Sequence, residues 1–226
     1  MSMGWQDLLF LHWPVAPADL ARWIPRGLEL ETWEGRAWLG VVPFRMTGIR
    51  LRWLPPIPGT DAFPELNVRT YVRCGDRSGV WFFSLDAAHR LAVRVARAGY
   101  HLNYLDARME CAEREGWIQY RSRRTHAGAP PAEFSARYRP KGEVACSRAG
   151  SLEAWLTERY SLFAADAAGG IYRGDIEHAP WPLQAAEAVV ETNSMTQGLG
   201  LELRGEPLAH FSRTLDVRAT RIWRVG

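Results

Sequence analysis

Short runs in which polar and apolar residues alternate recur along the whole chain, and they limit the fold more than any other feature. In "FPELNVRTYV", the side chains of Glu65, Asn67 and Arg69 share one face of an extended chain, while the residues between them share a mainly apolar face. This period of two is typical of a half-buried β-strand. Comparable runs predict further strands at residues 4–13, at 28–46 around a turn at Glu34 and Gly35, and at 80–85, 104–110, 117–123, 132–138, 171–178, 187–193 and 208–217.

Helical patterns are few. The sequence predicts helices at residues 16–25, 86–100 and 151–160, with Asp86 and Ser151 as N-caps of the last two. The proline-rich run "RWLPPIPGTDAFPEL" predicts a long loop that leads into the Glu65 strand. No linker, repeat or low-complexity tract divides the chain. We therefore expect one domain over residues 1–226, a mainly β (β-rich α+β) fold built as an antiparallel β-barrel with a few peripheral helices.

Composition excludes several classes of function. A formal charge of only +3, with arginines scattered along 226 residues, argues against nucleic acid as a partner. Cys74, Cys111 and Cys146 lie far apart without a CxxC pair, so neither a disulfide framework nor a zinc site is predicted. The chain shows no leader pattern and no apolar run of membrane-spanning length, which favours a cytoplasmic protein without a membrane partner. No cofactor motif is present.

The polar face of the Glu65 strand is the candidate site. Consecutive side chains on one face lie about 7 Å apart, so a carboxyl and a guanidinium could flank one small ligand. Arginine binds carboxylates in bidentate fashion, and a glutamate removed from water has a raised pKa suited to proton transfer. A solvated face of salt-bridged side chains fits the same pattern. A second polar face, starting at His210 in "HFSRTLDVR", would complete a wet barrel interior if both faces pointed inward.

Several segments carry a family resemblance: "GRAWLGVVPFRM", "FPELNVRTYV", "GVWFFSLDAAHRLAVRVARAGY", "GSLEAWLTERYSLF", "YRGDIEHAPWPLQ" and "HFSRTLDV". In this order they resemble the YqjF-like family of uncharacterised bacterial proteins, a relative of the acetoacetate-decarboxylase-like fold. The resemblance implies a curved antiparallel barrel with an interior pocket. It places Glu65 at the pocket glutamate of acetoacetate decarboxylases, and it places their paired lysines at Ser84, Leu85 and Asp86, where this chain has no amine. Its only lysine, Lys141, is expected in a surface turn, so a lysine Schiff base is not expected.

Two main interpretations follow, with a small-molecule ligand and no cofactor or metal in either. In the first, an enzyme acts on a carboxylate- or carbonyl-bearing molecule by acid/base chemistry, with Glu65 as the proton-transfer group. The other candidate site residues bind the ligand: Arg69 or Arg45 as anion clamp, Asn67 and Ser84 as hydrogen-bond donors, and Asp86 and His210 beside them. In the second, the same residues only bind. A third interpretation, a protein-interaction module, requires several of the 11 tryptophans exposed in one patch. Homo-oligomerisation is left open.

Overall fold

A computed structural model describes residues 1–50, 62–89, 94, 97 and 99–225. Most of the predicted proline-rich loop, and residues 90–93, 95, 96 and 98 of the predicted helix at 86–100, lie outside these residues. The described elements, in chain order, are β1 (Ser2–Val15), α1 (Pro17–Ala21), β2 (Glu29–Leu30), β3 (Ala37–Arg50), β4 (Ala62–Cys74), β5 (Arg77–Ala87), β6 (Tyr104–Arg114), β7 (Trp117–Arg124), β8 (Glu133–Ala145), α3 (Leu152–Thr157), β9 (Ser161–Ala165), β10 (Ile171–Glu177), β11 (Leu183–Asn193), η1 (Gln197–Leu199), β12 (Leu208–Ala219) and β13 (Trp223–Arg224).

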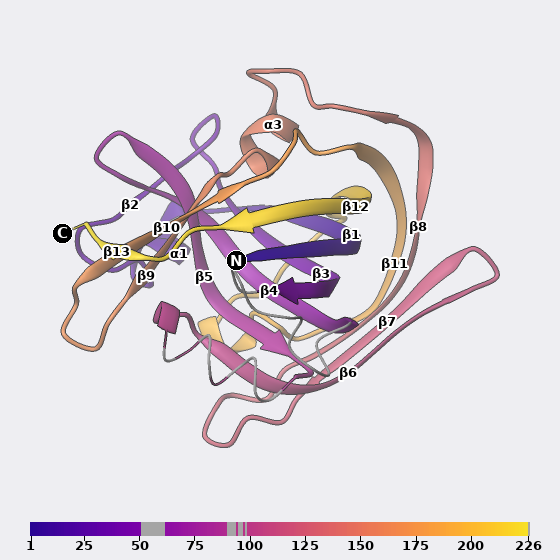
Figure 1. The fold of residues 1–226 in the computed structure, drawn as a ribbon, viewed down its shortest axis with the longest axis horizontal. Coiled ribbons are helices and arrows are strands. Elements are labelled where there is room, and N and C mark those ends of the chain that lie inside the picture. The colour runs from indigo at the N-terminus through magenta and orange to yellow at the C-terminus, as the bar shows by residue number, and fades with distance from the viewer. Residues whose placement is uncertain (51–61, 90–93, 95–96, 98, 226) are drawn as a thin grey trace.

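Within the described residues, the strands form one 13-stranded sheet that closes on itself twice. Strands β12, β1, β3, β4 and β5 pair in this order and form a shared wall, which crosses the middle of Figure 1. The two outer strands of this wall, β5 and β12, each pair with two further strands along their outer edge. The first half of β5 pairs with β9 and its last residues pair with β6, while β12 pairs with β11 near its start and with β10 at its end.

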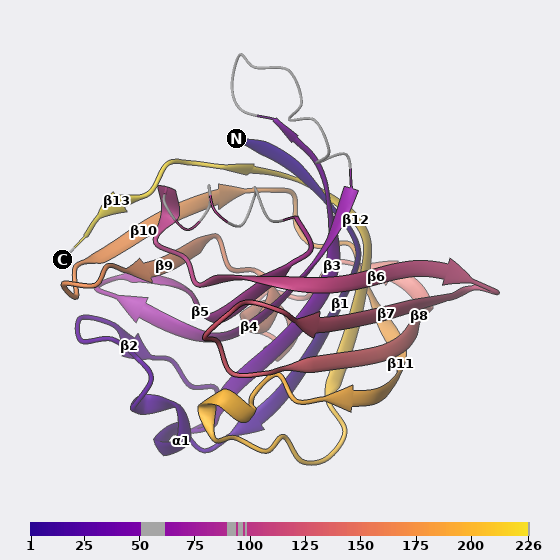
Figure 2. The same cartoon turned by 90° about the horizontal axis from the view of Figure 1, so that it is seen from below.

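Two rings therefore share the wall. The first ring is completed by β6, β7, β8 and β11, and the second by β9 and β10. Figure 2 shows these two sets of strands on opposite sides of the wall. The predicted β-rich barrel is confirmed, with one difference: the β5–β6 and β5–β9 pairings are parallel. Parallel neighbours need a long crossover, which the stretch between β5 and β6 provides.

Alternation along β4 assigns one face of the wall to each ring. Leu66 and Val68 point into the first ring, where apolar side chains from every strand of that ring form the largest core cluster, including Tyr120, Phe134 and Tyr138. On the opposite face, Phe63 joins a second cluster inside the second ring. The first ring holds the largest apolar cluster, and the second ring holds a cavity.

Local structure agrees with most sequence predictions. The predicted turn is present: Glu34 and Gly35 have φ of 49° and 74°, and Trp33 and Arg36 bond each other's backbone across it. The strands on either side of the turn do not pair with each other, however, since β2 pairs with β4. Ser151 caps α3 by accepting a hydrogen bond from the Ala154 amide at 3.3 Å. Among the described residues, no helix combines the length and the apolar character needed to cross a bilayer.

The predicted N-cap role of Asp86 is wrong. Asp86 is the penultimate residue of β5 and is fully buried. Its carboxylate accepts hydrogen bonds from Nε and Nη2 of Arg124, both at 2.8 Å. This bidentate ion pair, which depends on a residue 38 positions away, holds Asp86 in the strand.

Candidate functional site

A cavity of about 250 Å³ lies inside the second ring. Its walls come from β1, β3, β4 and β5 of the shared wall and from β9 and β10 opposite, together with Tyr100 and Leu102 before β6 and Trp181 after β10. Most lining side chains are apolar. The polar ones form a short series that starts on β4 with Glu65, Asn67 and Arg69.

The pairing of β3 with β4 shows which residues lie side by side along the cavity wall. Residues directly opposite each other in an antiparallel pair point to the same face. Arg69 lies opposite Gly40, Asn67 opposite Val42, and Glu65 opposite Phe44 of β3. The sequence interpretation that these three β4 side chains share a face thus becomes a definite geometry, in which an amide stands between a guanidinium and a carboxyl.

Glu65 is the buried acid of the cavity, with 2% of its surface exposed. The Tyr104 hydroxyl donates to both carboxyl oxygens at 3.3 Å. Burial raises the pKa of Glu65 to about 8, the hydrogen bond from Tyr104 opposes this rise, and the charge of Asp86 adds to it. At neutral pH Glu65 is therefore mainly protonated and can donate a hydrogen bond or a proton.

Arg69 places a buried positive charge in the cavity. One of its terminal nitrogens, Nη2, donates to the carbonyl of Leu156 at the end of α3 at 3.2 Å, while Nε has no partner in the part of the chain that the structure describes. Its guanidinium carbon lies 5.3 Å from the ring centre of Phe10. Among the described residues, no carboxylate forms an ion pair with Arg69. A guanidinium removed from water without a counter-ion is costly, so this site favours an anion.

Further polar residues, which the sequence interpretation missed, lie at the Arg69 end of the cavity. Thr157, Arg159 and Ser161 all line it. Arg159 is tied down on two sides, because Nη1 forms an ion pair with Glu31 and Nε donates to the Trp155 carbonyl at 2.6 Å. Its Nη2 is buried without a partner. The period of two in "TERYS" was the available signal, but it extends over too few residues to stand out.

The next residue after Arg69 on the same face of β4, Tyr71, forms a buried pair with His12. The Tyr71 hydroxyl lies 2.7 Å from Nε2 of His12, and both side chains are fully buried. Burial lowers the pKa of His12 well below its usual value, and the charge of Arg69 lowers it further. The imidazole is therefore neutral. It neither balances the charge of the Arg69 guanidinium nor competes with that guanidinium for an anion.

The family model of DUF2071, described as an uncharacterized conserved protein, matches residues 2–216. The chain belongs to the DUF2071 family. It is 44% identical over 218 residues to the uncharacterized protein YqjF of Bacillus subtilis (strain 168), covering 96% of this chain and 89% of YqjF. The resemblance found in the sequence is confirmed.

Solved structures of the same fold come from proteins with little sequence identity. The enduracididine biosynthesis enzyme MppR superposes with a TM-score of 0.68 at 11% identity, over 100% of this chain and 87% of MppR. An acetoacetate decarboxylase from Legionella pneumophila superposes with a TM-score of 0.67 at 13% identity, over 100% and 87% of the two chains. These likenesses establish that this DUF2071 protein has an acetoacetate-decarboxylase-like fold.

The remaining candidate residues lie away from the cavity. Ser84 and Asp86 both bond Arg124, with the Arg124 Nη2 to Ser84 Oγ distance at 3.1 Å, and neither lines the cavity. Arg45 pairs with Asp7, its Nε lying 2.9 Å from the carboxylate. Of the two clamps considered from sequence, only Arg69 faces the cavity.

His210 and Lys141 are also outside it. His210 lies half-buried on β12, where burial lowers its pKa and its Nδ1 has no partner. Lys141 is exposed on β8, a strand of the first ring. No lysine therefore lines the cavity, and the described residues bring no group of three His, Cys, Asp or Glu side chains together as a metal site.

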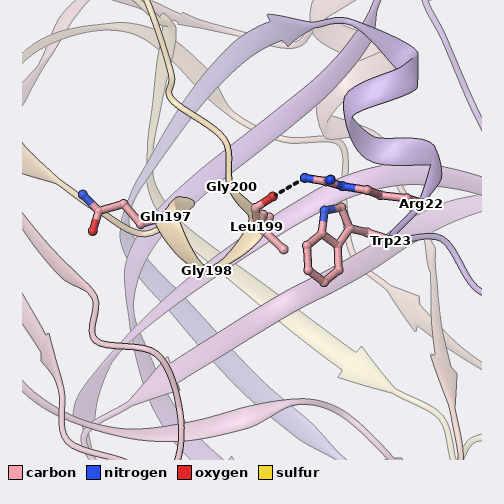
Figure 3. Close-up of a pocket in the computed structure, with 6 residues that line it drawn as sticks. All are labelled: Arg22, Trp23, Gln197, Gly198, Leu199 and Gly200. Carbon is pink, nitrogen blue, oxygen red and sulfur yellow. Dashed lines mark hydrogen bonds between the residues drawn. The ribbon is translucent and has the colours of Figure 1, made fainter.

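A shallow depression elsewhere is a weaker candidate. Between the end of α1 and η1, Arg22 Nη2 donates to the Leu199 carbonyl at 3.1 Å beside the Trp23 indole, while the Gln197 side chain points away (Figure 3). This depression lies on the surface, and Arg22 is its only charged group. Trp23 and Trp223 are the exposed tryptophans of the described chain; Trp23 lies in the turn after α1 and Trp223 in β13. The cavity is therefore the better site.

Proposed function

We propose that this DUF2071 protein binds a small carboxylate-bearing molecule in the cavity of the second ring, and that Glu65 transfers a proton to a carbonyl group of that molecule. The observation that carries the proposal is the Arg69 guanidinium, which is buried and has no ion-pair partner among the described residues. A carboxylate would supply the missing charge and accept from Nε.

Arg159 supports a carboxylate at the same end. Like Nε of Arg69, its Nη2 is a buried donor without a partner among the described residues, and its other nitrogens are fixed by Glu31 and Trp155. Fixed donors lose little entropy on binding, so two guanidiniums in this arrangement form a preorganised anion site. Both arginines together could hold one carboxylate or the two oxygens of a carboxylate and an adjacent carbonyl.

Glu65 supplies the chemistry. Its carboxyl group is protonated at neutral pH because the folded-state pKa is about 8. Donation of this proton to a ligand carbonyl oxygen lets a water molecule remove a hydrogen from the carbon next to the carbonyl, which gives the enol. A solvent proton then adds to that carbon while the enol hydroxyl returns its proton to Glu65, so the hydrogen exchanges with solvent. Asn67 lies between Glu65 and Arg69, and its Oδ1 is buried without a partner. MppR, which shares the fold, has been solved with pyruvate, a keto carboxylate.

Binding is tested by titration calorimetry with 2-oxobutanoate, a keto carboxylate that carries exchangeable hydrogens. We expect saturable binding that weakens at least tenfold in Arg69→Met, which loses a charge-assisted contact of about 1.5–3 kcal/mol. Arg73→Met is the matched control, because Arg73 lies on the same strand but is exposed and paired with Glu29. Equal affinity in the parent and Arg69→Met would exclude the anion site.

Proton transfer is tested with the same compound in deuterium oxide. Proton NMR should show faster loss of the hydrogens next to the carbonyl with the parent protein than without it, and Glu65→Gln should lose this acceleration but keep the binding. A non-catalytic binding protein is the second candidate, because no lysine lines the cavity. Saturable binding without accelerated exchange in the parent would favour that candidate.

A further inference from the structure

We infer that the ligand is an aliphatic carboxylate whose hydrocarbon end lies at the opposite end of the cavity from Arg69. This inference rests on the proposed function, because Arg69 fixes the carboxylate end. It adds a substrate class, the acyl-chain carboxylic acids, and a direction of binding.

The polarity of the cavity wall changes along its length. At the Arg69 end the lining includes the polar side chains of Thr157, Arg159 and Ser161. Beyond Glu65 the next cavity-facing residue of β4 is Phe63, which lies opposite Met46, and Met46 lies opposite Trp5 of β1. The side chains lining this end are apolar: Met3, Trp5, Met46, Ile49, Phe63 and Trp181.

The side chains that form this apolar end are arranged in two ways. Trp5 and Trp181 stack with ring centres 5.7 Å apart and planes 17° apart, which gives the cavity a flat, rigid side. Met3 and Met46 contribute flexible thioether side chains, which adjust to ligands of varying shape. A rigid aromatic side beside adaptable methionines suits a hydrocarbon chain. Among the described residues, no Asp, Glu, Lys or Arg side chain lines this end; its polar groups are the indole N–H groups of Trp5 and Trp181 and the imidazole of His89, whose ring centre lies 5.4 Å from that of Phe63.

The dimensions limit the chain length. Phe63 and Arg69 are six residues apart on β4, which corresponds to about 20 Å along the strand. The volume of about 250 Å³ equals about eight water molecules at their liquid volume of about 30 Å³ each. A carboxylate of about six to eight carbons matches this volume. Its extended chain is shorter than the distance between Arg69 and Phe63, so its hydrocarbon end points towards Phe63, and a longer chain exceeds the volume.

Titration calorimetry with straight-chain saturated carboxylates, from acetate to dodecanoate, tests the inference. Each added methylene should tighten binding about fourfold, equivalent to about 0.8 kcal/mol per buried CH₂, up to about six to eight carbons, and further carbons should add nothing. Alcohols of the same length are the control for the anion site, and they should bind at least tenfold more weakly than the acids.

Two variants separate the cavity from adventitious adsorption of long chains. Met46→Trp fills the apolar end and should shorten the optimal chain, whereas Phe63→Ala enlarges it and should lengthen the optimum. Met195→Trp is the matched control, because Met195 is equally buried but belongs to the core of the first ring. Either cavity variant, if folded by circular dichroism, is sufficient for the test.

The outcomes distinguish this inference from the proposed function. If short carboxylates bind through Arg69 but elongation brings no gain, the aliphatic class is wrong while the anion site holds. An optimum that neither cavity variant shifts would also refute the assignment of the apolar end. If no carboxylate of any length binds, the proposed function itself fails.

Discussion

Replacement of Glu65 by glutamine should change the pH dependence of stability in a way that reports directly on the buried carboxyl. Glu65 has an ordinary pKa of 4.5 when exposed and about 8 in the folded protein. Between these values the folded state keeps a proton that the unfolded state has lost. The free energy of unfolding of the parent therefore falls as pH rises, and this contribution is complete below pH 4.5 and is lost as pH rises through about 8.

The size of the effect follows from the shift. One pKa unit corresponds to about 1.36 kcal/mol, so a rise from 4.5 to about 8 amounts to about 5 kcal/mol between the two limits. Glutamine keeps the shape and the hydrogen-bonding capacity of the protonated acid but cannot ionise. Relative to the parent, Glu65→Gln should gain stability by about 1.4 kcal/mol per pH unit between pH 5 and pH 8.

Urea unfolding of both proteins, followed by circular dichroism at half-unit steps from pH 5 to pH 9, measures this difference. Other titrating groups, His12 among them, are common to both proteins and cancel in the difference. Parallel stability profiles of the two proteins would contradict a raised pKa of Glu65, because Glu65 would then titrate with the same pKa in the folded and unfolded states.

Three further changes should have defined effects. Tyr104→Phe removes the hydrogen bond that lowers the pKa of Glu65, so the pH at which the Glu65→Gln difference levels off should move upward; an unchanged or lower midpoint would contradict this. Asp86→Ala leaves the charge of Arg124 buried and unpaired, which should cost about 3–5 kcal/mol in urea unfolding, and a loss below 1 kcal/mol would show that the pair is not structural. Ser151→Ala removes the cap of α3 and should cost about 1 kcal/mol, whereas a neutral result would show that the cap contributes nothing.

Much of the fold could be predicted from local patterns. The alternation in β4 places Glu65 and Leu66 on opposite faces whatever the strand pairs with. Gly35 favours a turn at this point because glycine readily adopts a positive φ, although the positive φ of Glu34 is uncommon for its residue type. The division into two rings could not be predicted in this way, because it depends on which half of β5 and of β12 meets each neighbour. Pairing partners so distant in sequence leave no local signal.

The same distinction between local and distant contacts separates the site residues that could be predicted from those that could not. Glu65, Asn67 and Arg69 share one strand, so their common face could be predicted from sequence. Arg159 could not, because its place at the cavity depends on Glu31, 128 residues away. Asp86 shows the converse error: an aspartate before a helical pattern favours a cap, but the ion pair with Arg124 outweighs that local preference.

The most direct test of the cavity as a carboxylate site is a crystal structure with 6-bromohexanoate, in which anomalous scattering locates the bromine. The proposal predicts the carboxylate on the guanidinium of Arg69, within reach of Arg159, and the chain directed towards the apolar end, so that the bromine lies nearer to Phe63 and Met46 than the carboxylate does. A bromine peak beside Arg69, or a ligand bound outside a cavity that remains empty, would contradict it.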